Sequence, residues 1–87
     1  MIDNQEQQRF QTVENGHLVF ANYHIRDGIH LLTHVEAEQE LRGTGAAARL
    51  MEDIAAHARA KGLKLRPRCP YAVAWFRRHP EAADLLA

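Results

Sequence analysis

Apolar and polar residues alternate along the first part of the chain with the period of two that is typical of β-strands. The alternation covers residues 9–14, 18–25 and 29–36, and short polar segments separate these stretches. Asn15-Gly16, between the first two, is the strongest short hairpin signal. We therefore predict an antiparallel meander of three strands, preceded by a polar terminus, residues 1–7, that we expect to fray.

The period then changes to that of an amphipathic helix between residues 46 and 61, and Gly62 follows as a helix-ending residue. Apolar side chains recur at spacings of three and four, at Ala47, Leu50, Met51, Ile54 and Ala58. On the polar side, Arg49 and Asp53 are four residues apart. We expect these two side chains to pair, because positions i and i+4 are neighbours on a helix surface.

The remaining segments complete an α+β domain. Residues 63–66 alternate and predict a short strand, which a right-handed crossover would place parallel to the third strand. Pro70 suits the first turn of a following helix, and Pro80 ends it before one last short turn. The expected architecture is a three-stranded antiparallel meander extended by one parallel strand, with one central helix and one or two short C-terminal helices.

Length and composition indicate one small globular domain, residues 1–87, with a limited core. Such a core would gain stability from a partner, so the sequence leaves a homodimer open. The polar segment 1–8 lacks the apolar core of a signal peptide, and no apolar run is long enough to span a membrane. The single cysteine, Cys69, excludes an internal disulfide and suits a reducing compartment, so we expect a cytoplasmic protein.

The formal net charge is zero, but the basic residues gather between positions 59 and 78, where no acid occurs. This asymmetry indicates an anionic ligand, although a solvated basic surface explains it equally well. Nucleic acid is disfavoured because the chain has no arginine-rich run and no overall basicity.

The segment Arg42-Gly43-Thr44-Gly45-Ala46-Ala47, which we call the glycine loop, joins the third strand to the central helix. Its two glycines allow a tight turn and a close approach of the backbone to a ligand. The helix that follows offers unpaired N–H groups and the positive end of its dipole. We therefore predict a phosphate site, although the Gly-Lys-Ser/Thr of a Walker motif and the third glycine of a Rossmann motif are absent.

Three blocks of sequence resemble the GNAT superfamily of acyl-CoA-dependent N-acetyltransferases, and in particular its very small single-domain members. They are the Arg-x-x-Gly-x-Ala pattern of the glycine loop, the run from His34 to Gly45, and the Cys-Pro-Tyr...His-Pro-Glu run from Cys69 to Glu81. Val35, Ala37 and Glu38 stand where those members usually carry Thr, Val and Pro, which alters the local hydrogen bonding at the end of the strand.

The resemblance implies a minimal GNAT-like fold that uses acetyl-CoA to acetylate a primary amine. It also implies that backbone amides of the glycine loop hold the pyrophosphate and that a strand amide near Val35 or Glu36 polarises the thioester carbonyl. The implied coenzyme A residues are Val35, Glu36, Arg42, Gly43, Thr44, Gly45, Ala46 and Ala47.

Four residues are candidates for the chemistry. His34 is a candidate base because histidine changes charge near neutral pH, and Glu36 would orient it or attract the amine. Cys69 is a candidate nucleophile whose thiolate a helix N-terminus and nearby arginines would favour, and Tyr71 is a weaker candidate proton donor. Each has a structural alternative, with Cys69 as a buried apolar residue and His34 as the hydrogen-bonded partner of a neighbouring residue.

No metal site is expected, because His30 and His34 would lie roughly 13 Å apart along one strand. Two further functions fit the sequence. One is an acyl-CoA-binding module without catalysis, and the other is a small interaction domain whose basic surface holds an acidic partner or a second copy of the chain.

Overall fold

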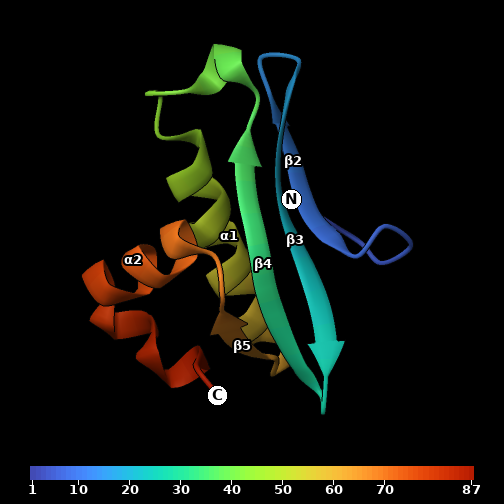
Figure 1. The fold of residues 1–87 in the computed structure, drawn as a ribbon, viewed down its shortest axis with the longest axis vertical. Helices are drawn as coiled ribbons and strands as arrows, with labels where there is room; N and C mark the ends of the chain where they lie inside the picture. The colour runs from blue at the N-terminus through green and yellow to red at the C-terminus, as the bar shows by residue number, and fades with distance from the viewer.

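A computed structural model describes residues 1–87 and contains one five-stranded sheet in the order β1-β2-β3-β4-β5 (Figure 1). The first four strands are antiparallel, and β5 pairs with β4 in parallel. The elements are β1 (Ile2–Asn4), β2 (Arg9–Glu14), β3 (His17–Arg26), β4 (Ile29–Ala37), η1 (Gln39–Leu41), α1 (Ala46–Lys61), β5 (Lys64–Pro67), α2 (Pro70–Arg78) and η2 (Pro80–Leu85). The predicted α+β class is confirmed, and so is the last strand, which pairs in parallel.

The amino terminus departs from the prediction that residues 1–7 fray. Ile2–Asn4 form strand β1, so the antiparallel meander has four strands and not three. The Tyr23 hydroxyl donates a hydrogen bond of 2.6 Å to the Asp3 carboxylate and ties β1 to β3. Burial, and then this hydrogen bond, raises the pKa of the Tyr23 phenol. A strand this short, with a single apolar residue, shows no alternation from which it could have been predicted.

A β-bulge at Thr33 changes which side chains of β4 face the core. The pairing passes from Asn22–His34 directly to Tyr23–Leu32 and leaves Thr33 without a partner on β3. Before the bulge, His30 and Leu32 face inward, and after it Val35 does. Strict alternation along residues 29–36 predicts Leu32, His34 and Glu36 on one face, but the extra residue shifts every later side chain to the other face.

All the helices pack against one face of the sheet. Figure 1 shows α1 behind β3 and β4, with α2 and η2 beside it, and no helix in front of these two strands. The inward face and the helices share one core, whose largest fully buried side chains are Phe10, Val19, Leu32, Leu50, Met51, Ile54 and Leu65. None of the helices has the length and apolar character needed to cross a membrane.

β4 and β5 run together for only part of their length. Ile29–Leu32 pairs with Lys64–Pro67, and the next two amides, of Arg68 and Cys69, both donate to the Leu32 carbonyl, at 2.8 and 3.1 Å. The chain then turns into α2 at Pro70, whereas β4 continues to Ala37. The edge of β4 beyond Leu32 therefore has no neighbouring strand on its β5 side.

We expect the packing of α1 on the sheet to supply much of the stability. Ile54 is completely buried, so Ile54→Ala should lower the free energy of unfolding by about 2–5 kcal/mol through lost burial and the cavity left behind. Urea denaturation measures the change. Val13→Ala, at a side chain that is 63% exposed, is the control and should cost less than about 0.5 kcal/mol. Equal losses in the two variants would contradict this description of the core.

Candidate functional site

A cleft of about 430 Å³ lies where β4 separates from β5. Residues 35–37 of β4 form one wall, the glycine loop and the first turn of α1 form another, and Tyr71 of α2 lies opposite. The divergence of β4 and α2 therefore creates a concave site in which Tyr71 lies near two segments that are close to each other in sequence.

The backbone of the glycine loop leaves a group of donors without acceptors. Gly43 and Gly45 have φ angles of 80° and 84°, in the left-handed region that favours glycine. No backbone carbonyl accepts a hydrogen bond from five amides of this segment, all in residues that line the cleft: Gly43, Gly45, Ala46, Ala47 and Ala48. No side chain caps the helix either. The start of this 16-residue helix therefore offers a set of free N–H groups at the positive end of its dipole.

The edge of β4 offers further donors. The Glu38 amide donates to the Leu18 carbonyl, which fixes this pair as a hydrogen-bonded one. Because such pairs alternate along antiparallel strands, the amides of His34 and Glu36 point toward β3 and those of Val35 and Ala37 point to the open edge. Of the two residues expected to offer a strand amide, the register favours Val35.

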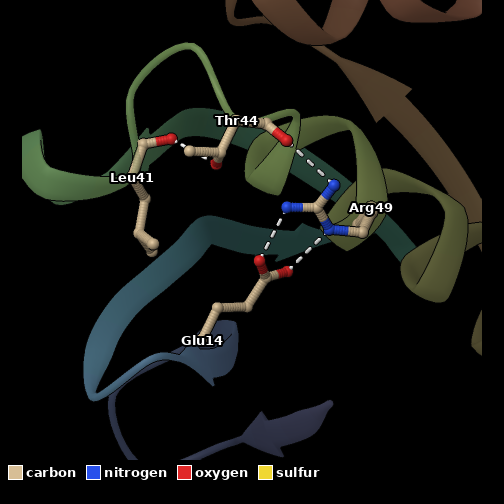
Figure 2. Close-up of polar contacts among 4 residues, drawn as sticks. All are labelled: Glu14, Leu41, Thr44 and Arg49. Atoms are coloured by element: carbon tan, nitrogen blue, oxygen red, sulfur yellow. Dashed lines mark hydrogen bonds and ion pairs between the residues drawn. The ribbon is translucent and has the colours of Figure 1, made fainter.

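Arg49 holds the glycine loop against the sheet (Figure 2). Its guanidinium donates to both carboxylate oxygens of Glu14, at 2.7 and 3.0 Å, and its Nη1 donates to the Thr44 carbonyl at 2.9 Å. The Thr44 hydroxyl in turn donates to the Leu41 carbonyl at 2.5 Å. These contacts fix the turn that precedes α1, and Figure 2 shows Arg49 reaching from the helix to both neighbours.

The predicted pairing of Arg49 with Asp53 was therefore wrong, because Arg49 pairs with Glu14 across 35 residues of sequence. The hydrogen bonds from Arg49 hold the pKa of the Glu14 carboxyl below its usual value. A depressed carboxyl pKa stabilises the folded state above the unfolded pKa, and this contribution is lost as the pH falls through the folded value. The ion pair between Glu14 and Arg49 should therefore contribute less to the stability of the folded state in acid.

His34 and Glu36 lie together, as expected from their two-residue spacing. The His34 Nε2 atom is 3.0 Å from a carboxylate oxygen of Glu36, and both side chains face away from the core. Glu36 lines the cleft, whereas His34 lies beside it. The pair thus stands where the cleft meets the uncovered face of the sheet.

Tyr71 and Cys69, the two candidates in the C-terminal block, lie in different surroundings. Tyr71 lines the cleft, and burial raises the pKa of its phenol despite an opposing effect of Arg78. Cys69 is only 8% exposed, belongs to the core and does not line the cleft. It precedes α2 as the N-cap residue, with its amide bonded to the Leu32 carbonyl.

Most of the residues assigned to coenzyme A from the sequence line this cleft, the exception being Thr44. Thr44 acts on the loop itself, through its carbonyl and hydroxyl. Arg42 lines the cleft, is exposed, and its side chain makes no hydrogen bond or ion pair. Sequence reasoning missed Ala48, which continues the first helical turn, and Arg49, whose partner is remote.

Comparison with known families agrees with these features. The family model described as GCN5-related N-acetyl-transferase matches residues 9–85, which covers every element except β1. The chain therefore belongs to this family, as its resemblance to GNAT proteins implied. A search of curated proteins finds no match.

We predict that Arg49 matters for ligand affinity more than for stability. Arg49→Gln should weaken coenzyme A binding by roughly fivefold, about 1 kcal/mol, because the loop loses its fixed geometry. Calorimetric titration measures the affinity. Arg59→Gln is the matched control, since it removes another exposed ion pair of α1, with Asp84, remote from the cleft. Unchanged affinity in Arg49→Gln, or an equal loss in both variants, would contradict the prediction.

Proposed function

We propose that this protein transfers an acetyl group from acetyl-CoA to a primary amine. The observation that carries the proposal is the row of free amides at the start of α1, beside the open edge of β4. Membership of the GCN5-related N-acetyl-transferase family supports the reaction class. The location of the charges and donors supports an assignment of each part of the cofactor to a part of the cleft.

In this proposal the pyrophosphate binds the amides of the glycine loop and the first turn of α1. The helix dipole and the unpaired guanidinium of Arg42 add attraction for the negative charge. The pantetheine arm then follows the open edge of β4 toward Leu32, where the strands separate. The Val35 amide donates to the thioester carbonyl and stabilises the oxyanion that forms when the amine attacks.

The proton transfers use the residues at the mouth of the cleft. His34 takes one proton from the arriving ammonium group, so that the neutral amine can attack. The nitrogen then forms a bond to the acetyl carbon as the carbon–sulfur bond breaks, and the second proton that it loses replaces the one that Tyr71 gives to the thiolate. Glu36 orients the imidazole through their hydrogen bond and attracts the ammonium form of the substrate. The Tyr71 phenol is protonated at neutral pH, as an ordinary tyrosine is, and burial raises its pKa further, so it can donate to the departing thiolate.

Direct attack is favoured over a route through Cys69. An acyl-enzyme would require the Cys69 thiol to reach the thioester, but this side chain is buried in the core and outside the cleft. Buried cysteines of this kind are usually inert. We therefore assign Cys69 to packing at the start of α2, next to the point where the strands part.

The assignment of the pyrophosphate can be tested with two matched glycine substitutions. Gly43 and Gly28 both have positive φ angles and open space where an alanine methyl group would lie, but only Gly43 lines the cleft. Gly43→Ala should weaken coenzyme A binding at least about tenfold, because strain moves the loop amides, and Gly28→Ala should leave it unchanged. Calorimetry gives both affinities. Equal affinity in the two variants would refute the site.

Two further variants grade the contributions within the loop. Gly45→Val should abolish detectable binding, because a Cβ at this position would lie 3.1 Å from the Arg49 Nη1 atom and block close approach of the phosphate. Arg42→Ala should cost less, roughly fivefold, since it removes one exposed charge and leaves the amides in place. A larger loss in Arg42→Ala than in Gly45→Val would show that charge, and not the backbone, holds the ligand.

The route of the acetyl group is open to a direct measurement. We expect no change in intact mass when the protein is incubated with acetyl-CoA alone, because direct transfer leaves no acyl-enzyme. Cys69→Ala should retain turnover, and His34→Ala should lose about 10²-fold or more. A gain of one acetyl group that hydroxylamine removes, absent in Cys69→Ala, would instead establish Cys69 as the carrier. Coenzyme A binding without turnover of any amine would indicate a binding module.

A further inference from the structure

No helix covers the outward face of the sheet in Figure 1, and this face carries several arginines. Because paired residues on neighbouring strands share a face, the register assigns Arg9, Phe20, Arg26, Leu31 and Arg66 to this side. The core lies entirely on the other side, and no helix covers this one in Figure 1. We call this surface the outer face.

The outer face carries positive charge without compensating carboxylates. None of its three arginines, at positions 9, 26 and 66, forms an ion pair, whereas Arg49 and Arg59 on the helix side each do. The only carboxylate that the strands place on this face is that of Glu36, which lies within hydrogen-bond distance of the His34 ring. Arg9 instead lies over the Phe20 ring at 5.2 Å and donates to the Gln11 side chain. The face therefore attracts anions.

The cleft opens onto this same face. Glu36 belongs both to the lining of the cleft and to the outer face. An amine can therefore approach the thioester from the outer face, past His34 and Glu36. Arg9 lies on β2, in line with His34 through Asn22, and Arg66 lies on β5 opposite Leu31, before β4 separates from β5. Strands β2 and β5 are about 14 Å apart at the usual strand spacing.

We propose that the outer face binds an acidic polypeptide segment and presents its lysine amine to the cleft, an inference that rests on the proposed acetyltransferase function. Charge complementarity argues for an anionic partner. The separation of Arg9 and Arg66 across several strands argues for an extended chain over a small metabolite, which could not contact both arginines. The Glu36 carboxylate then receives the single cationic group of the segment, its lysine, at the mouth of the cleft.

The test uses three peptides with blocked termini and one lysine each, flanked by glutamates, alanines or arginines and labelled with fluorescein. Fluorescence anisotropy with coenzyme A present gives each affinity, and mass spectrometry with acetyl-CoA follows acetylation. The glutamate peptide should bind at least about tenfold more tightly than the alanine peptide, and less tightly as salt rises. Tighter binding of the alanine or arginine peptide would overturn the proposal.

Paired variants identify the surface. Arg9→Gln/Arg66→Gln should weaken binding of the glutamate peptide roughly tenfold, as expected when two exposed charge pairs are lost. Lys61→Gln/Arg77→Gln removes the same charge from exposed helix positions and should have no effect. Equal losses in the two double variants would overturn the assignment. So would a single-stranded oligonucleotide that binds more tightly than the glutamate peptide and is released by the first pair.

Binding and turnover separate this inference from the function on which it rests. Acetylation of all three peptides at equal efficiency would support the acetyltransferase and overturn the acidic-segment proposal. Selective binding of the glutamate peptide, with no acetylation of any amine, would support the docking surface and contradict the proposed function.

Discussion

The site depends on the point where β4 and β5 stop pairing. Two successive amides, of Arg68 and Cys69, converge on the single carbonyl of Leu32, and Pro67 just before them has no N–H to extend the ladder. Pro70 then starts α2, where its fixed φ angle suits the first turn. These residues end the parallel pairing while β4 continues, and the open strand edge and the cleft follow from that separation.

The free amides of the glycine loop can act as a site only if the loop is held in one conformation. Two glycines in the left-handed region give the turn its shape, and Arg49 links the loop to Glu14 at the far end of the meander. An exposed ion pair of this kind contributes little to the free energy of unfolding. Its importance lies in geometry, since it fixes the start of α1 against the strands that form the other wall.

The two faces of the sheet have different roles. The inward face is packed by α1 and α2. No helix covers the outward face in Figure 1, and none of its three arginines forms an ion pair. The bulge at Thr33 decides which side chains of β4 lie on each face, because it turns Val35 toward the core and leaves His34 and Glu36 on the outward face. A strand without this extra residue would place Leu32 and Val35 on opposite faces, and the core packing and the exposed pair could not coexist.

Much of the fold and part of the site were predictable from the sequence, because local patterns encode them. The alternation of β2 to β4, the helical period of α1, the glycines at 43, 45 and 62 and the prolines that bound α2 all act within a few residues, so they can be recognised without the fold. The loop residues that line the cleft followed from the same local features. Strand β1 and the bulge at Thr33 did not, because pairing with distant residues determines both.

The tertiary structure alone decided the contacts between remote segments. Arg49 is bonded to Glu14 and not to its helical neighbour Asp53, Cys69 is enclosed in the core, and the uncompensated arginines share one face. Each outcome depends on which surfaces the sheet and helices bring together. A sequence pattern specifies a strand or a helix through residues that are close in sequence. Burial and long-range pairing, in contrast, are fixed only when the elements pack.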